Sequence, residues 1–319
     1  MEYQEFIRGI QAAVEDRLGN DIQTKIQKIV KNNNIKLDGL IIMDGVGTAS
    51  PTIYLNEYYH QFSLERTIED IAEEICDIYE KSREGVEFDV DRFQDFERAK
   101  KSIAFKLVNR EMNEELLREI PYESILDLAI IYYYIVETRD FGIASAVIGK
   151  EHLTMWDITK EELLMIALEN TKSLLKPKMH HILDVMDKME AVSCREGRGM
   201  VREEFQYEEM IEEFLEDFDK KVMTVDMPMF VLTNEYWTNG AACIFYTGLL
   251  EQISQTLDTD LYIIPSSIHE VILLPLNEKI DMEELDRMIQ QVNQEDLKPG
   301  EVLSHHVYMY RRTDKKLTM

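Results

Sequence analysis

One short motif occurs three times along this chain at nearly equal intervals, and it restricts the architecture more than any other feature of the sequence. The first two copies read Gly-x-Ala-Ser-x-x-Ile and cover residues 47–53 and 142–148, and a looser third copy covers residues 240–246. Each copy follows an apolar run and precedes a stretch with helical periodicity. Because repetition at a fixed spacing is typical of a repeated structural unit, the sequence predicts one β-hairpin-plus-helix unit used three times. The expected fold class is α+β, with a largely antiparallel sheet and helices packed on it.

Chain length and one polar stretch predict the domain boundaries. A chain of 319 residues can form roughly two to three cores. Residues 193–199 contain two glycines and mixed charges without an apolar period, which is typical of a linker. We therefore expect an N-terminal α+β unit at residues 1–100, a middle unit at 101–192 and a C-terminal unit at 200–319.

Local patterns predict the elements inside these units. Amphipathic spacing or a capping pattern predicts helices, which are expected at residues 2–18, from Thr67, from Thr159, at 180–191, 203–221 and 247–257, and from Asp281. Runs of β-branched and aromatic residues predict strands, which are expected at residues 40–43, 51–55, 102–108, 126–136, 229–232, 261–264, 271–274 and 302–310. Residues 22–30 fit either a strand or a helix.

The charge balance is strongly acidic. There are 35 Lys and Arg residues against 62 Asp and Glu residues, which gives a net charge of −27. A field of this sign repels nucleic-acid phosphates and anionic membrane surfaces, so we expect neither partner. The longest apolar run, residues 128–136, is under half of the roughly 20 residues that a membrane helix needs.

Cysteine usage and the N-terminus predict a cytoplasmic location. Cys76, Cys194 and Cys243 are odd in number and widely spaced, and they have no metal-finger spacing. Free thiols in a reducing compartment fit this pattern. The first residues lack the basic and apolar regions of a signal peptide.

The strongest catalytic hypothesis makes Cys243 a nucleophile. Papain-like and transglutaminase-like hydrolases place a cysteine at a helix start and a histidine on a later strand, and His269 follows Cys243 in that order. His269 would generate the thiolate, and Asn239 or Glu270 would orient the imidazole.

The other interpretation of Cys243 is packing. Ala241, Ala242 and Cys243 are small, so a strand and a helix could approach closely there. The repeat favours this interpretation, because the matching residue of the first copy, Ser50, precedes Pro51 in a predicted strand where no nucleophile would be presented.

A binding role is the main functional hypothesis. Asn239, Ser266, Ser267 and His269 bring polar groups to an apolar segment, which is the composition of a ligand groove. The sequence therefore favours a non-catalytic cytosolic binding or regulatory protein that recognises a protein or a small ligand, with the cysteine hydrolase as the alternative. It specifies neither the partner nor the oligomeric state.

No metal or cofactor is expected. Neighbouring residues point apart on a strand and do not share a helix face, so the pairs at residues 180–181 and 305–306 are not natural chelates. His60 and His152 lack carboxylates that can be assigned to the same site. The two Gly-x-Gly segments, at residues 45–47 and 197–199, do not continue as nucleotide-binding fingerprints.

Three parts of the chain carry recognisable motifs. They are Pro51-Thr52-Ile53-Tyr54-Leu55-Asn56, then Lys106-Leu107-Val108-Asn109 with Asn113-Glu114-Glu115-Leu116-Leu117, and finally Asn239-Gly240-Ala241-Ala242-Cys243 with Tyr262-Ile263-Ile264-Pro265-Ser266-Ser267-Ile268-His269-Glu270-Val271. These motifs resemble an uncharacterised bacterial family, a domain of unknown function often found in anaerobic Gram-positive bacteria. The resemblance covers most of the chain and implies no activity, because the family has no established one.

Overall fold

The computed structural model describes most of the chain, in nine ranges. They are residues 1–19, 22–43, 52–62, 66–83, 89–139, 142–185, 229–276, 281–295 and 297–319. Most of the first motif copy, the predicted linker at 193–199 and the predicted helix at 203–221 lie outside the described residues. The contacts divide the chain into two units, Met1–Phe93 and Gln94–Met319. The predicted middle and C-terminal units both fall within the second unit, so their independence stays a prediction.

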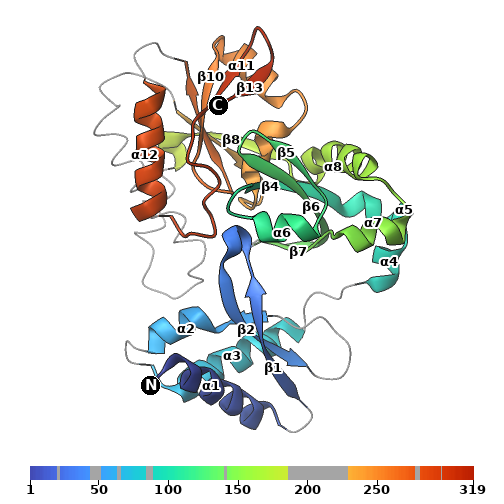
Figure 1. Ribbon diagram of the computed structural model, residues 1–319, viewed down its shortest axis with the longest axis vertical. Coiled ribbons are helices and arrows are strands. Elements are labelled where there is room, and N and C mark those ends of the chain that lie inside the picture. Colours follow the sequence, from blue (N-terminus) through green and yellow to red (C-terminus); the bar gives the residue numbers. More distant parts are fainter. Residues whose placement is uncertain are drawn as a thin grey trace. The chain divides into compact units, whose positions relative to one another are not determined.

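The first unit packs helices on an antiparallel sheet (Figure 1). Its elements are α1 (Tyr3–Leu18), β1 (Gln23–Val30), η1 (Asn32–Asn34), β2 (Lys36–Met43), β3 (Thr52–Tyr54), α2 (Leu55–Phe62) and α3 (Ile68–Arg83). Buried side chains of α1, β2 and α3, such as Phe6, Leu40 and Ile75, meet in one core. The segment that fitted either a strand or a helix is β1, because it pairs with β2 along its whole length.

The second unit begins with short helices and a four-stranded antiparallel sheet. Helix α4 (Val90–Gln94) contains the boundary between the two units. The elements after it are α5 (Phe96–Ala99), η2 (Lys100–Ser102), β4 (Ile103–Asn109), α6 (Glu114–Glu119), β5 (Tyr122–Ile125), β6 (Leu128–Arg139), β7 (Gly142–Val147), α7 (Lys150–Trp156) and α8 (Lys160–Leu174). The long strand β6 pairs with β4 on one side and with β5 and then β7 on the other. Helix α8 lies against β4, where the hydroxyl of Thr171 accepts a 3.0 Å hydrogen bond from the amide of Phe105.

A six-stranded antiparallel sheet forms the rest of the second unit. Its strands are β8 (Pro177–His181), β9 (Phe230–Asn234), β10 (Leu261–Pro265), β11 (Val271–Pro275), β12 (Tyr308–Arg311) and β13 (Lys316–Thr318), in the order β13-β12-β10-β11-β9-β8. Helix α12 (Met282–Glu295) packs its buried Leu285 and Ile289 against this sheet (Figure 1). The connections include η3 (Gly240–Phe245) and α11 (Leu249–Leu257). Among the described helices, none combines the length and the apolar character that crossing a bilayer requires.

The α+β class and the antiparallel sheets are confirmed, but the motif copies differ in conformation. The second copy begins strand β7, whereas the third forms the 3₁₀ helix η3. The prediction of one strand over residues 302–310 is wrong for its first part, and β12 begins only at Tyr308. There the carbonyls of Leu303 and Ser304 accept side-chain hydrogen bonds from Asn109 and Asn293 instead of pairing in a ladder. The helix predicted at residues 180–191 is likewise wrong for His180 and His181, which belong to β8.

Candidate functional site

The loop after β9 is held in an unusual backbone conformation. Trp237 and Asn239 have φ angles of 50° and 55°, in the left-handed region that few residues other than glycine adopt. The fully buried Asn234 fixes this loop, since its amide donates to the carbonyl of Thr238 at 2.8 Å and its side-chain oxygen accepts from the amide of Tyr236 at 2.9 Å. The indole of Trp237 stacks on His180, with ring centroids 5.3 Å apart.

Gly240 lets three backbone segments meet beside this loop. A Cβ at this position would lie 2.4 Å from the carbonyl oxygen of His269 and 2.8 Å from the amide nitrogen of Asn234. Both distances are shorter than real contacts of a Cβ atom, so only glycine fits. The third motif copy therefore brings the start of η3, the end of β9 and the β10–β11 turn together.

The residues expected to bind a ligand are largely bonded to one another in this turn. His269 Nδ1 lies 3.3 Å from the amide nitrogen of Asn239, which donates to it. The amide of His269 donates to the hydroxyl of Ser267 at 2.8 Å. Ser266 is 8% exposed and Ser267 is fully buried. The structure thus gathers these predicted residues, but it uses much of their hydrogen-bonding capacity to hold the turn.

The imidazole of His269 is neutral near pH 7. Burial, with a smaller contribution from the charge of Lys106, lowers the pKa of His269 to about 4, while a hydrogen bond with the backbone of Trp237 opposes the shift. Part of the residue still reaches solvent. Near neutral pH the ring is therefore uncharged, and its Nδ1 acts as an acceptor for the Asn239 amide.

The thiol of Cys243 is not arranged as a nucleophile. Its Sγ donates to the carbonyl of Thr233 at 3.1 Å, and no hydrogen bond joins it to His269 in the described part of the chain. The side chain is fully buried, and burial raises the pKa of Cys243 to about 12. A thiolate would be needed for attack, so the hydrolase hypothesis lacks its activated group here. The full burial of Cys243 favours the interpretation of this small residue as a packing residue, which stays a prediction.

Glu270 does not orient the imidazole either. The residue is fully buried, and neither carboxylate oxygen has a hydrogen-bond partner among the described residues. Burial raises the pKa of Glu270 to about 7, although the nearby hydroxyls of Ser267 and Ser266 oppose the rise. Those hydroxyls thus act on the carboxyl without reaching normal hydrogen-bond geometry.

A second location, a surface hollow of about 740 Å³, was missed by the sequence reasoning. It lies where the end of β4, helix α6, strand β5 and the start of α7 come together. Its lining residues are Arg110, Glu111, Glu114, Leu117, Arg118, Tyr122 and Lys150. No motif signals this grouping, because its members are scattered between residues 110 and 150 and are of common residue types. A local signal existed only in Arg110 and Arg118, two cations close together in an acidic chain.

The hollow rests on a packed scaffold. Buried Val108, Leu117, Ile120 and Ile131 form a small core beneath it. The amide of Arg110 donates to the carbonyl of Asp127 at 3.0 Å, which fixes the chain where it leaves β4. Backbone positions around the hollow are therefore set by regular structure rather than by long loops.

The charged side chains of the hollow differ in their partners. Arg118 forms an exposed ion pair with Glu114 at 3.6 Å. The Nζ of Lys150 donates to the carbonyl of Arg118, which links the start of α7 to α6. The guanidinium of Arg110 makes no hydrogen bond or ion pair with the described residues.

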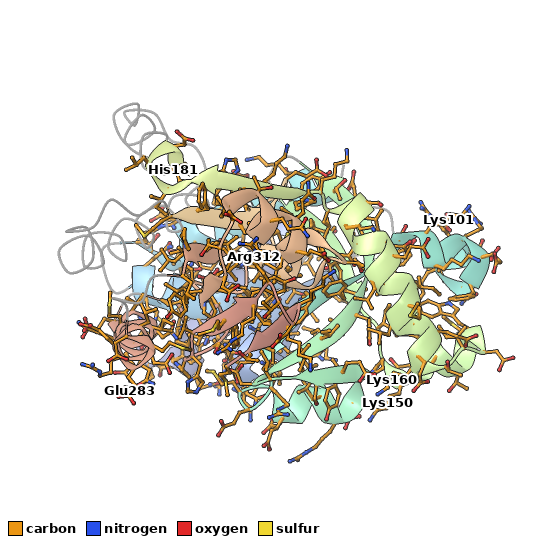
Figure 2. All side chains as sticks on the ribbon, turned by 90° about the horizontal axis from the view of Figure 1, so that it is seen from above. Lys101, Lys150, Lys160, His181, Glu283 and Arg312 are labelled. Carbon is orange, nitrogen blue, oxygen red and sulfur yellow. The ribbon has the colours of Figure 1, made fainter. Side chains whose placement is uncertain are left out.

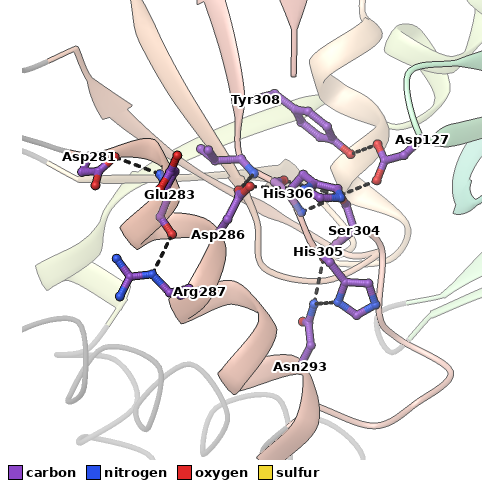
Figure 3. A network of polar contacts seen from close by, with 11 residues as sticks. Asp127, Asp281, Glu283, Asp286, Arg287, Asn293, Ser304, His305, His306 and Tyr308 are labelled. Carbon is purple, nitrogen blue, oxygen red and sulfur yellow. Dashed lines mark hydrogen bonds and ion pairs between the residues drawn. The ribbon is translucent and has the colours of Figure 1, made fainter.

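The adjacent histidines contact different partners. His305 Nδ1 lies 3.0 Å from the amide nitrogen of Asn293, while His306 Nδ1 lies 3.2 Å from Asp286 Oδ2 (Figure 3). His180 stacks on an indole, and His181 contacts the ring of Phe230. Over the described ranges, no three His, Cys, Asp or Glu side chains are grouped as a metal site.

One carboxylate ties the β5–β6 turn to the C-terminal segment. Asp127 accepts a 2.7 Å hydrogen bond from the hydroxyl of Tyr308 and a 2.6 Å hydrogen bond from that of Ser304 (Figure 3). Since the carbonyl of Asp127 also holds Arg110, this network reaches the wall of the hollow.

Comparison with known proteins assigns the chain to a family whose function is unknown. The model of DUF5688, a family of unknown function, matches residues 3–312. No curated protein and no solved structure shows a significant match. The resemblance to an uncharacterised family seen in the sequence motifs is thereby confirmed.

Proposed function

Because the chain belongs to DUF5688, whose function is unknown, its role has to be inferred from its own side chains, and we propose that it is a non-catalytic ligand-binding protein. The ligand site is the hollow between the end of β4, α6, β5 and the start of α7. The observation that carries this proposal is the hollow itself, about 740 Å³ on a packed scaffold.

Size and lining support a small-molecule site. Ligand pockets commonly enclose roughly 300–1,000 Å³ and combine apolar walls with a few polar groups. Here Leu117 and Tyr122 supply apolar surface, and charged groups stand around them. The buried, protonated thiol of Cys243 supports a role without a cysteine nucleophile.

The hollow is preferred over the groove predicted from Asn239, Ser266, Ser267 and His269. Those residues hold their own turn, so a ligand would have to compete with internal hydrogen bonds. The cytoplasmic location predicted from composition belongs to the same proposal, and the free, buried thiols of Cys76 and Cys243 support a reducing compartment.

A thermal-shift screen of small metabolites tests the proposal. The wild type is compared with Glu114→Trp, which places an indole at the hollow, and with Glu115→Trp as the matched control. Glu114 is 65% exposed and lines the hollow, whereas the exposed Glu115 on the same helix does not. We expect at least one compound to raise the melting temperature of the wild type and the control but not that of Glu114→Trp. Equal shifts in all three proteins, or no shift with any compound, would refute the site.

A further inference from the structure

The lining of the hollow contains more basic than acidic residues, which is the opposite of the balance in the whole chain. Its lining holds the cations Arg110, Arg118 and Lys150 and only two carboxylates, Glu111 and Glu114. The whole chain carries 62 acidic residues against 35 basic ones. Three cations from β4's end, α6 and α7 thus surround one hollow in a molecule that otherwise repels anions.

These cations are available to a ligand. Arg110 has no ionic partner among the described residues, so its five donors are free to bind. The pair between Arg118 and Glu114 is solvent-exposed at 3.6 Å, a geometry whose net stabilisation is about 0–1 kcal/mol. An anionic group can therefore replace Glu114 at little cost.

The third cation is held in place. Because Lys150 donates to the Arg118 carbonyl, its ammonium stays at the edge of the hollow with two further N–H donors to offer. Lys150 is exposed, and its side chain is labelled in Figure 2. A lysine held in this way loses less conformational entropy on binding than a free one.

We infer that the hollow binds a small polyanion carrying phosphate or carboxylate groups, an inference that rests on the ligand site proposed above. The anionic groups contact Arg110, Arg118 and Lys150, and the uncharged part of the ligand lies on Leu117 and Tyr122. Arginine forks match the planar oxygens of both anion types, so the chemistry shared by phosphate and carboxylate is what the lining recognises.

Isothermal titration with pyrophosphate and with citrate tests the inference and separates the two anion types. Arg110→Gln removes a charge that has no ionic partner among the residues that the structure describes. Lys101→Gln is the control, because it removes the same charge from an exposed lysine outside the hollow (Figure 2). One lost charge-assisted hydrogen bond corresponds to about a 10-fold weaker affinity. We expect that loss for Arg110→Gln and less than about a 2-fold change for Lys101→Gln.

The outcomes separate the ligand class from the ligand site. Binding of either probe that Arg110→Gln and Lys150→Gln both weaken supports the inference, and the stronger probe identifies the anion type. If neither probe binds, or if both variants bind as the wild type does, the anionic class is wrong. In that case the site itself is still supported if a neutral compound raises the melting temperature of the wild type and of Glu115→Trp but not that of Glu114→Trp. If no compound does so, both proposals are refuted.

Discussion

Glu270 and His269 are neighbours whose pKa values are shifted in opposite directions, and in both cases the folded state favours the uncharged form. Burial raises the pKa of the Glu270 carboxyl from 4.5 to about 7 and lowers that of the His269 imidazole from 6.5 to about 4. Neither group is among the charges that shift the other. Replacing each one separately should therefore reveal two independent and opposite pH dependences of stability.

The sign and size of the Glu270 effect follow from its raised pKa. The folded state favours the protonated carboxyl, so its contribution is fully present below pH 4.5 and is lost as the pH rises to about 7. At about 1.4 kcal/mol per pH unit, the shift corresponds to about 3 kcal/mol. Glu270→Gln keeps the shape of the side chain and removes its titration. The stability of the variant relative to the wild type should therefore increase by about 2–3 kcal/mol as the pH rises from 5 to 8.

The pH dependence of stability expected from His269 has the opposite sign. Its folded state favours the neutral ring, so its contribution is fully present above pH 6.5 and is lost as the pH falls to about 4. His269→Asn should therefore gain about 2 kcal/mol relative to the wild type as the pH falls from 7.5 to 5, on top of a constant loss from the Asn239 contact.

Urea unfolding followed by tryptophan fluorescence measures both differences. The two tryptophans, Trp156 and Trp237, lie in the second unit, so the signal reports on the unit that contains the mutations. Subtracting the wild type at each pH cancels the titration of the other acidic groups. A Glu270→Gln difference that stays constant within about 1 kcal/mol from pH 5 to pH 8 would refute the burial of an unpaired carboxyl.

Three further predictions concern the second unit. Gly240→Ala should destabilise it by about 2–3 kcal/mol, because the added methyl group would meet the backbone at His269 and at Asn234. The control Gly248→Ala has open space but a positive φ, and it should cost about 1 kcal/mol; similar losses for both variants in urea unfolding would contradict the close approach at Gly240. Cys243 should react with a thiol reagent at pH 7 only after unfolding, as peptide mapping can test, and rapid native labelling would revive the nucleophile hypothesis. Tyr308→Phe should cost about 1–3 kcal/mol in the same unfolding assay by removing a bond to Asp127, and an unchanged midpoint would show that the bond contributes little.

Elements with local signals could be predicted from the sequence. The hydroxyl of Thr159 accepts from the amide of Glu162 at 3.2 Å, and the carboxylate of Glu162 accepts from the amide of Thr159 at 2.8 Å, so this helix start is encoded within four residues. The apolar run of β6 and the paired runs of β10 and β11 also contain enough β-branched residues to identify strands.

Features set by distant contacts could not be predicted. The sequence predicts a strand from Val302, but the side chains of Asn109 and Asn293 donate to the carbonyls of Leu303 and Ser304. Likewise, Cys243 and His269 have the order of a hydrolase, but in the structure the thiol is buried and donates to the carbonyl of Thr233. The hollow depends on β5 pairing with β6, which brings Tyr122 beside α6.

The bonds of Asp127 impose an order on assembly during synthesis. Its two hydroxyl partners, Ser304 and Tyr308, lie 177 and 181 residues later in the sequence. Contacts between such distant parts of a chain form slowly, because a long loop must close before they are made. The turn that supports Arg110 can therefore acquire its final restraint only after residue 308 has been synthesised, and a nascent chain that stops before residue 304 would contain Asp127 without its two hydroxyl partners.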